Sequence, residues 1–215
     1  MSIEVDETVW EPVPEQGDPT TKVWHDGDGV TLVLNSIGFD RDLFSRLSDE
    51  QAVREYYRDQ FAEQSIGIVE CNVLEKDGKQ IVKTIGKSIS EGQPVTYIAS
   101  VAIPLSDRSY VFSLYAQEQG ITGVRDTAIM TKLMLEGHLC DPDIESGTIL
   151  GWAQDPYFPE YQGPCLRNLS EDEKYDPEFP DHPLSKVRMQ VNKLVEFITL
   201  STDSTQSSKQ WWKVW

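Results

Sequence analysis

Apolar and polar side chains alternate between residues 66 and 118, in four segments that are separated by short turns. The segments span residues 66–75, 80–89, 95–103 and 109–118. Alternation with a period of two is typical of β-strands, because successive side chains point to opposite faces of a sheet. Short connections join strands that run in opposite directions, so the pattern predicts an antiparallel meander. In the fourth segment both alternating sets are largely apolar, which predicts a central strand covered by helices.

A hairpin is predicted before the meander, at residues 22–37. Two apolar runs flank the sequence Asp-Gly-Asp-Gly at residues 26–29, and an Asp-Gly pair tolerates the positive φ of tight turns. Residues 76–79, which also contain Asp-Gly, supply the same signal inside the meander. In the first segment of the meander, strict alternation predicts that Ile68 and Cys71 lie on opposite faces.

The stretch LSDEQAVREYYRDQFAEQ predicts the first helix. Ser48 is expected to be its N-cap, and Gln51, three residues later, completes a capping box. Val53, Tyr57 and Phe61 recur every four residues, which predicts one buried face. The opposite face is charged, and we expect it to lie in water.

The segment LYAQEQGITGVRDTAIM (residues 114–130) begins like a strand and ends like a helix. Gly120 is expected to turn the chain out of the sheet, and Thr122 to cap a helix that begins at Gly123. Arg125 is expected to pair with a carboxylate or a sheet-edge carbonyl rather than to perform chemistry. These four residues are therefore interpreted as a structural corner.

The helix after this corner is expected to end at Glu136, with Gly137 in the position where a left-handed glycine terminates a helix. Val124, Ala128 and Leu135 fall on one side, with Ile129 and Leu133 adjoining, which favours burial of that side. We therefore expect this helix to cover a face of the meander.

Residues 141–183 have a different character, with seven prolines, many acidic side chains and several aromatic rings. This composition predicts an ordered segment that wraps the domain by packing its rings. Apolar residues with helical spacing then predict a last helix over residues 184–201.

The chain is interpreted as one domain with two appendages. Residues 1–21 are acidic and rich in proline, which predicts an extended arm with Trp10 as its anchor. Residues 22–201 form the expected single α+β domain, with a core at residues 22–136. Residues 202–215 form a C-terminal tail.

The 215 residues include 19 basic and 36 acidic side chains, which gives a net charge of −17. Nucleic acids and anionic membranes repel such a surface, so neither is an expected partner, whereas a basic protein is attracted. No apolar run reaches the roughly 18 residues that a membrane helix needs. Three cysteines without an export signal predict reduced thiols in a cytoplasmic protein.

A metal site is the first candidate for chemistry. His138, Cys140, Cys165 and His182 are of the residue types that bind zinc. Their spacing matches no zinc pattern, and no CxxC pair is present. We therefore expect neither a metal nor a cofactor.

Acid–base chemistry in the loop around His182 is the second candidate. Asp176, Glu178 and Asp181 lie close to this histidine in sequence, and Ser185 follows. Carboxylates tune the pKa of a histidine, so a small hydrolase stays open as an alternative. It requires a concave pocket that holds His182 and at least two carboxylates within hydrogen-bond reach.

Aromatic residues supply the candidate partner-binding surface. Tryptophans exposed at a terminus are costly to leave in water, and tryptophan is enriched among interface hot spots. The tail is therefore expected to bind a partner, to fold back on the domain, or to pair with another copy in a homodimer. The candidates are Trp211, Trp212, Trp215, Trp152, Tyr157 and Phe158.

Two stretches are similar to a known family: the strand YVFSLYAQE, which runs into the corner at residues 120–125, and TYIASVAIPLSDRSY at residues 96–110. Over residues 22–136 the chain resembles the PsbP-like family, which includes the extrinsic photosystem subunit, a Ran-binding nuclear import factor and many bacterial proteins of unknown role. The resemblance implies an antiparallel sheet packed between helices, no catalytic residues, and function by docking on other proteins. The run DPEFPDHPLSKVR resembles a block found in uncharacterised bacterial proteins and departs from the family core.

Together these patterns predict a non-catalytic module that binds a basic protein. Its most specific form is a bacterial immunity or adaptor protein whose acidic surface covers a basic effector. The hydrolase and a homo-oligomeric scaffold that uses the tryptophan-rich tail stay as alternatives.

Overall fold

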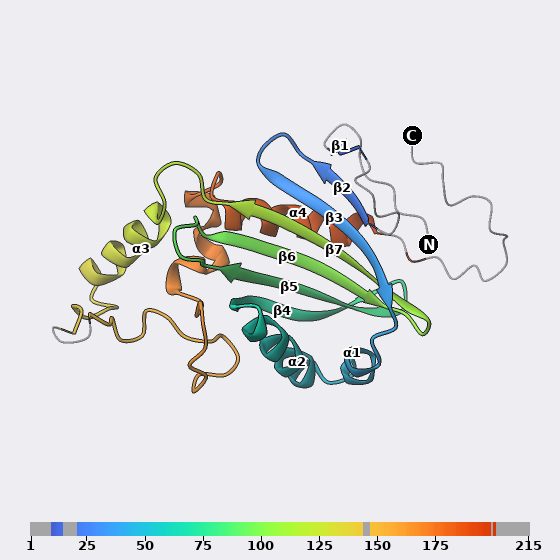
Figure 1. Cartoon of the computed structure of the whole chain (residues 1–215). Helices are drawn as coiled ribbons and strands as arrows, with labels where there is room; N and C mark the ends of the chain where they lie inside the picture. Colours follow the sequence, from blue (N-terminus) through green and yellow to red (C-terminus); the bar gives the residue numbers. More distant parts are fainter. Residues whose placement is uncertain (1–9, 15–20, 144–146, 199, 201–215) are drawn as a thin grey trace.

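In the part of the chain that the structure describes, seven β-strands form one antiparallel sheet in the order β1-β2-β3-β7-β6-β5-β4 (Figure 1). The structure is a computed structural model, and it describes residues 10–14, 21–143, 147–198 and 200. The strands are β1 (Glu11–Pro12), β2 (Thr21–His25), β3 (Val30–Gly38), β4 (Ile66–Lys76), β5 (Lys79–Ser88), β6 (Thr96–Pro104) and β7 (Arg108–Gln117). β4 pairs antiparallel with β5, β5 with β6, and β6 with β7, which confirms the predicted meander.

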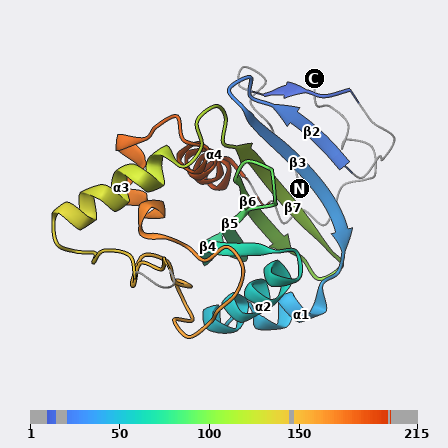
Figure 2. The same ribbon diagram turned by 60° about the vertical axis from the view of Figure 1, so that its left-hand side comes forward.

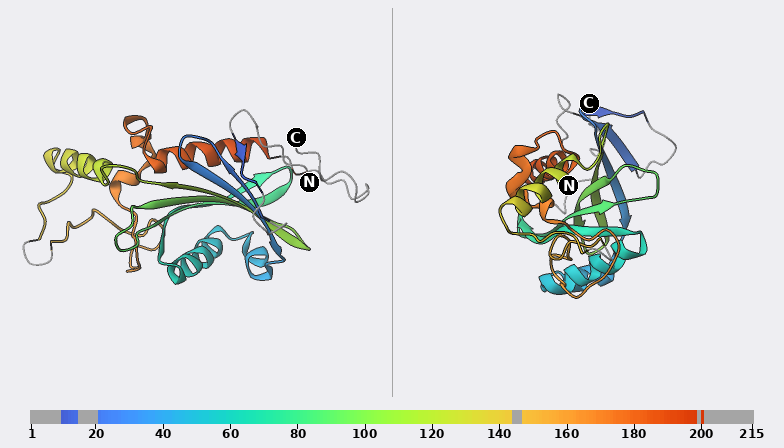
Figure 3. Two further views of the ribbon diagram at one scale, coloured as in Figure 1. Left: turned by 45° about the horizontal axis from the view of Figure 1, so that its top comes forward. Right: turned by 90° about the vertical axis from the view of Figure 1, so that its left-hand side faces the viewer.

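Helices cover both faces of this sheet (Figure 3, left). They are α1 (Arg41–Arg46), α2 (Glu50–Glu63), α3 (Val124–Leu135) and α4 (Pro183–Phe197), with the 3-10 helices η1 (Leu169–Glu171) and η2 (Glu173–Glu178). Helix α2 packs on β4, whereas α4 packs on β6, β7 and β3 from the opposite side. The predicted α+β sandwich, an antiparallel sheet between helices, is therefore confirmed. None of the described helices combines the length and the apolar character needed to cross a bilayer.

The two faces of the sheet bury separate apolar clusters. Alternation along β6 places Val101 and Ile103 in the cluster under α4, and Ala102 in the cluster under α2. Leu184 and Val187 of α4 are fully buried against the first cluster. Burial of each such side chain contributes roughly 1.5–3 kcal/mol, so the sheet faces supply most of the driving force for this sandwich.

A β-bulge in β4 overturns the predicted alternation at one place. The register with β5 shifts between Ile68 and Glu70. Ile68 consequently lies with Cys71 in the cluster under α2, although strict alternation predicts opposite faces. A bulge inserts one extra residue into a strand and so changes which side chains share a face beyond it. Glu70 is thereby directed toward α4, where it contacts Arg188.

Helix α3 does not cover the sheet, which corrects the sequence prediction. It extends from one end of the sheet and packs on η1 (Figure 2). Its buried residues are Arg125, Ile129 and Leu133, whereas Val124 and Leu135 are exposed. Ile129 and Leu133, which adjoin the expected apolar side, are buried as part of a face that also contains the charged Arg125. Helix α4, from the end of the chain, covers the sheet instead.

Two predicted helix caps are also wrong. Asp49, rather than Ser48, caps α2, and its side chain accepts two backbone hydrogen bonds from the first turn. Thr122 does not cap α3, because Gly123 is the N-cap residue and provides no side-chain hydrogen bond. Gly120 and Gly123 have φ values of 71° and 72°, which glycine adopts without steric cost. The corner therefore depends on backbone conformation rather than on a threonine cap.

We call the proline-rich residues 141–183 the wrapping segment. Its described part passes along the outer edge of β4 (Figure 2). The N–H of Cys71 in β4 donates to the hydroxyl oxygen of Tyr157 at 2.7 Å. Gly67 lies so close to this segment that a Cβ atom built on it would be 1.9 Å from the carbonyl oxygen of Cys165. Unpaired edge strands attract other strands, so this contact covers an edge that would otherwise promote association.

The two appendages are described to different extents. Trp10 is buried against the main apolar cluster, with 9% of its surface exposed. Glu11–Pro12 pairs with β2, so this part of the arm adds a short strand to the sheet. The tail, with Trp211, Trp212 and Trp215, lies outside the described residues, and its roles stay predictions.

Candidate functional site

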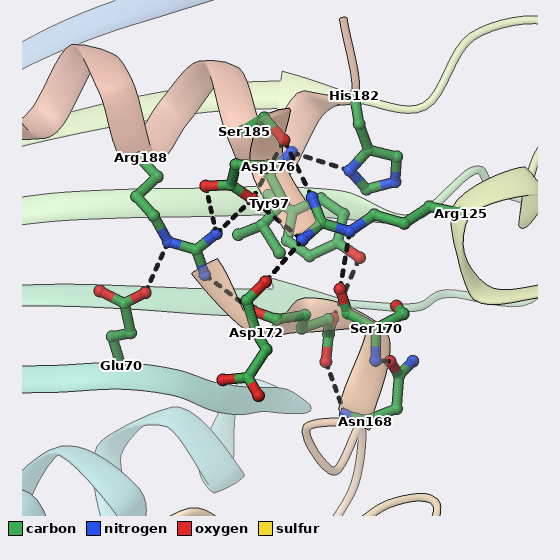
Figure 4. A network of polar contacts seen from close by, with 12 residues as sticks. Glu70, Tyr97, Arg125, Asn168, Ser170, Asp172, Asp176, His182, Ser185 and Arg188 are labelled. Carbon is green, nitrogen blue, oxygen red and sulfur yellow. Dashed lines mark hydrogen bonds and ion pairs between the residues drawn. The ribbon is translucent and has the colours of Figure 1, made fainter. Parts of the chain in front are cut away.

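Arg125 lies at the centre of a buried polar network (Figure 4). The first turn of α3 holds its side chain with 0% of its surface exposed. The guanidinium donates to the carbonyl oxygens of Ser170 and Asp172 at 2.8 and 3.1 Å, and to the Ser185 hydroxyl at 2.9 Å. Its Nη2 also lies 2.9 Å from Asp176 Oδ1. Arg125 thus pairs with a carboxylate and with carbonyl groups of the wrapping segment.

A second buried guanidinium, that of Arg188 in α4, shares the same carboxylate. Its Nη1 donates to both oxygens of Asp176, each at 2.7 Å, and its Nε donates to Glu70 Oε1 at 2.6 Å. Its Nη2 donates to the carbonyl oxygen of Glu171 at 2.9 Å. Asp176 therefore connects α3 with α4 through charge-assisted hydrogen bonds, which are stronger than neutral ones.

Glu171 anchors the wrapping segment to the sheet. Its Oε2 accepts hydrogen bonds from Lys87 Nζ at 2.9 Å and from the N–H of Asn168 at 2.7 Å, and its Oε1 accepts one from the Tyr97 hydroxyl at 3.0 Å. A fully buried carboxylate needs such donors, because burying an unpaired charge is very costly. Burial, with the adjacent Glu171, raises the pKa of Tyr97 well above its ordinary value, so the phenol stays a donor.

The network joins segments that are far apart in sequence, and its members are already bonded to one another. Ser185 and Asp176, which the hydrolase hypothesis would use, both contact Arg125 and also bond to each other at 3.2 Å. Removing one partner of a buried ion pair typically costs about 3–5 kcal/mol, because the other charge is left uncompensated. We conclude that the network holds the wrapping segment against the sheet.

A cavity of about 380 Å³ lies beside this network, where β7 ends and where α3 and α4 begin. The described residues that line it include four with carboxylate side chains: Asp28, Glu118, Glu178 and Asp181. The lining also includes Lys186 and Arg125. Lys186 is paired with Asp28 at 3.0 Å, and Arg125 with Asp176. The cations of the lining are thus paired, as are Asp28 and, with Lys132, Glu178. The carboxylates of Glu118 and Asp181 make the cavity acidic.

A second hollow, of about 540 Å³, lies at the opposite end of the sheet and is bounded by Phe44, Leu47 and Pro104. Three described residues have a buried side-chain atom without a hydrogen-bond partner, and none of them lines this hollow. Glu118, whose Oε2 is such an atom, lines the first cavity. The first cavity is therefore the stronger candidate for a binding site, and we name it the acidic cavity.

His182 and Glu118 form a hydrogen-bonded pair in the wall of the acidic cavity. His182 caps α4, because its Nδ1 accepts the N–H of Leu184 at 3.3 Å. Since Nδ1 is an acceptor, the ring proton lies on Nε2, which donates to Glu118 Oε1 at 3.2 Å. The N–H of Gly123 donates to the same oxygen at 3.2 Å. Glu118 Oε1 therefore has two donors, and Oε2 has none among the described residues.

Burial perturbs both members of this pair. Burial first, and the positive charge of Arg125 second, lower the pKa of His182 from 6.5 to about 4. The imidazole is therefore neutral at pH 7. Burial also raises the pKa of Glu118, and the nearby carboxylates of Asp126 and Glu171 act in the same direction. The carboxyl group of Glu118 thus lacks a compensating positive charge.

The three described aromatic residues that were predicted to bind a partner pack within the chain. Phe158 is 7% exposed, and the guanidinium carbon of Arg58 lies 4.4 Å from the centre of its ring. The guanidinium of Arg54 lies 4.2 Å from the centre of the Tyr157 ring. Trp152 packs against the apolar cluster of α3. Partner binding by these residues stays a prediction, and the structure gives them intramolecular contacts.

The candidate zinc ligands are spread over the molecule. His182 lies at the acidic cavity, His138 is exposed beyond α3, and Cys165 contacts the carbonyl oxygen of Ser65 beside β4. Cys140 is exposed. The described parts of the chain contain no group of three His, Cys, Asp or Glu side chains placed to hold a metal ion.

Sequence reasoning missed Glu118, Glu171 and Arg188. Arg188 follows Leu184 by four residues, and a charge on the apolar side of a predicted helix signals a buried partner. Glu171 follows Asn168 by three residues, which is the spacing of the capping box that the structure contains. Glu118 has no comparable local signal, because its side-chain partner His182 lies 64 residues away in sequence.

No protein-family model matches this chain, and no curated protein matches it. Among solved structures, cyanobacterial PsbP (CyanoP) from Synechocystis sp. PCC 6803 is 14% identical, with 60% of this chain and 77% of that chain covered and a TM-score of 0.39. PA94 from Pseudomonas aeruginosa, a protein of unknown function, is 12% identical, with 60% and 76% covered and a TM-score of 0.32. In a structure from Bacteroides thetaiotaomicron VPI-5482, 8% identical, the match spans 53% of this chain and 37% of that one, with a TM-score of 0.33. Likeness at this level carries no argument about function, and membership of the PsbP-like family stays a prediction.

Proposed function

We propose that this chain is a non-catalytic module that binds a basic protein. The observation that carries the proposal is the acidic cavity, whose lining carboxylates outnumber its cations and whose lining cations, Arg125 and Lys186, are already paired. The net charge of −17 adds a long-range attraction for a basic surface. A partner that inserts positive charge into this cavity is attracted both by the carboxylates of the lining and by the net negative charge of the chain.

The absence of catalysis is part of the proposal, and the bonding of the candidate catalytic groups supports it. His182 uses one ring nitrogen to cap α4 and the other to hold Glu118. The hydrolase alternative requires two carboxylates in hydrogen-bond contact with this ring, and among the described contacts there is one. The described lining of the acidic cavity also contains no serine, threonine or cysteine that would serve as a nucleophile.

The specific form of the proposal is a bacterial immunity or adaptor protein of the cytoplasm. In this form the acidic face covers a basic effector and blocks its functional surface. Complementary charge mainly accelerates association and excludes wrong partners, and added salt screens it. An immunity protein of this kind binds fast at low salt and more slowly as the salt concentration rises.

Capture from a native extract by two charge-matched variants tests this function. The cavity variant combines Glu178→Gln with Asp181→Asn, two exposed residues at the acidic cavity. The control variant combines Glu55→Gln with Glu63→Gln, two exposed residues of α2. Both variants lose two negative charges, so they have the same net charge; the cavity variant also loses the exposed pair between Glu178 and Lys132.

We expect the unmodified chain and the α2 variant to retain the same basic protein at low salt, and the cavity variant to retain much less of it. High salt is expected to release the captured protein. Equal retention by both variants, or retention that salt leaves unchanged, contradicts the proposal. A hydrolytic activity that is lost on His182→Asn would favour the enzyme alternative.

A further inference from the structure

The two carboxyl oxygens of Glu118 differ in their hydrogen bonding. Oε1 accepts hydrogen bonds from His182 and Gly123, whereas Oε2 is buried without a partner among the described residues. With 8% of its surface exposed, this side chain is more than nine-tenths buried, yet it lines the acidic cavity. A buried oxygen without a donor is a costly feature that a bound ligand can relieve.

The charges around Glu118 favour a cation as that ligand. The N–H at the start of α3, which would otherwise attract an anion, is already bound by Glu118 Oε1. Asp181 lines the same cavity and is exposed, and Glu178 contacts only an exposed lysine, Lys132. An incoming anion would meet these carboxylates without an unpaired cation in the described lining.

We propose that the acidic cavity receives a lysine side chain of the basic partner, with its ammonium group bonded to Glu118. This inference rests on the proposed function and specifies the group that the cavity recognises. A lysine ammonium is a compact point charge that needs a single acceptor oxygen, whereas an arginine guanidinium prefers both oxygens of a carboxylate. Since Oε1 already has two donors, the available acceptor suits lysine.

The mouth of the acidic cavity suits the lysine stem. Ile121 and Val124 line it with 86% and 51% of their surfaces exposed, and Phe179 and Pro180 are also part of the lining. Lysine buries its methylene chain along apolar surface while its ammonium group reaches a polar partner. Burial raises the pKa of Glu118, and an ammonium group beside it would lower this pKa again, because a nearby cation stabilises the ionised carboxylate.

Titration of the full chain with small amides tests the inference without the partner. The probes are Nα-acetyl-lysine methylamide, its Nε-acetylated form, which is neutral, and Nα-acetyl-arginine methylamide. Backbone amide NMR shifts report binding, and the N–H of Gly123 is the nearest reporter because it bonds to Glu118. We expect the lysine probe to bind at least about tenfold more tightly than the neutral probe, since hydrogen bonds to charged groups contribute roughly 1.5–3 kcal/mol. The lysine probe is also expected to bind more tightly than the arginine probe.

Two further measurements assign the binding to Glu118. Glu118→Gln keeps an oxygen for His182 and Gly123 but removes the charge, and we expect it to weaken the lysine probe about tenfold or more. Glu55→Gln, on the outer face of α2, is expected to leave the affinity unchanged. In the unmodified chain the affinity is expected to rise with pH as Glu118 ionises, and to rise less in Glu118→Gln, which keeps the other carboxylates of the lining.

Equal affinity for the lysine probe and its neutral form overturns the inference, as does an affinity that Glu118→Gln leaves unchanged. A pH dependence that is the same in the unmodified chain and in Glu118→Gln also overturns it. The proposed function fails separately, through the salt response and the charge-matched variants. Salt-sensitive capture that requires Glu178 and Asp181, together with no selective binding of the lysine probe, would leave the function standing and remove the lysine site.

Discussion

The imidazole Nε2 of His182 donates to Glu118 Oε1 at 3.2 Å, and this contact joins the start of α4 to the chain that leaves β7. Both side chains are more than nine-tenths buried. The contact brings a neutral histidine and a carboxyl group of raised pKa into one wall of the acidic cavity. It therefore links the stability of the fold to the site that we propose binds a partner.

Stability is expected to fall in acid because of His182. Burial lowers its folded pKa to about 4, whereas its ordinary value is 6.5, so the unfolded chain binds more protons between these values. The free energy of unfolding therefore falls as the pH is lowered from about 6.5 to about 4, by at most roughly 3 kcal/mol from this residue. Urea unfolding of the unmodified chain and of His182→Asn, which keeps a capping side chain, measures the difference.

The advantage of the unmodified chain over His182→Asn is expected to grow with pH through this window and then to level off. Glu118 acts in the opposite direction, because its raised folded pKa stabilises the protonated fold at low pH. Subtracting the variant curve isolates the histidine. Parallel curves from pH 4 to pH 7 would show that His182 is not the titrating group.

Glu118→Gln is expected to leave the fold intact and to stabilise it slightly at alkaline pH. The amide oxygen can accept the hydrogen bonds from His182 and Gly123, and the variant has no buried charge. We expect a gain of about 1 kcal/mol or less in the free energy of unfolding at pH 8, which disappears in acid as Glu118 becomes protonated. Thermal unfolding at both pH values measures this gain. A large loss at pH 8 would instead show that the ionised carboxylate stabilises the fold.

Arg188→Met is expected to destabilise the fold by about 3–5 kcal/mol, because it leaves the carboxylates of Asp176 and Glu70 without their shared guanidinium. Lys132→Met is the control, since Lys132 forms an exposed pair with Glu178 and such pairs contribute about 1 kcal/mol or less. Urea unfolding curves of both variants test the contrast. Similar small losses would mean that the network is not what holds the wrapping segment.

Gly67→Ala is expected to displace the wrapping segment from β4. The added Cβ would lie 1.9 Å from the carbonyl oxygen of Cys165, and a backbone atom cannot move aside as a flexible side chain can. Overpacking of this kind typically costs about 1–3 kcal/mol. Gly38→Ala is the matched control, because a Cβ at Gly38 meets nothing within 4 Å. Equal stability of the two variants would contradict the close approach seen here.

The sheet could be predicted from sequence because its signals are local. Alternation and the Asp-Gly turns locate β4–β7 to within one or two residues. The faces of β4 could not be predicted, because the bulge after Ile68 leaves no mark in the alternation. The buried face of α3 was predicted only in part, since Arg125 is charged and its burial depends on partners from the wrapping segment.

The candidate site was predictable only in part. A carboxylate or a carbonyl group was expected to pair with Arg125, because a guanidinium is a planar donor that is always charged. The structure pairs Arg125 with Asp176 and with two carbonyl groups. The pairing of Glu118 with His182 joins residues 64 positions apart, and no local pattern connects them. Such contacts depend on how α4 and the wrapping segment return to the sheet, which requires the three-dimensional fold.

The most direct test of the central claim is the association rate constant between this chain and the basic protein that it captures, measured at about 50 mM and about 300 mM salt. We expect a rate constant that falls at least about tenfold between the two conditions. At low salt we also expect slower association for the Glu178→Gln, Asp181→Asn variant than for the Glu55→Gln, Glu63→Gln variant. A rate constant that neither salt nor the position of the lost charges alters would contradict the central claim.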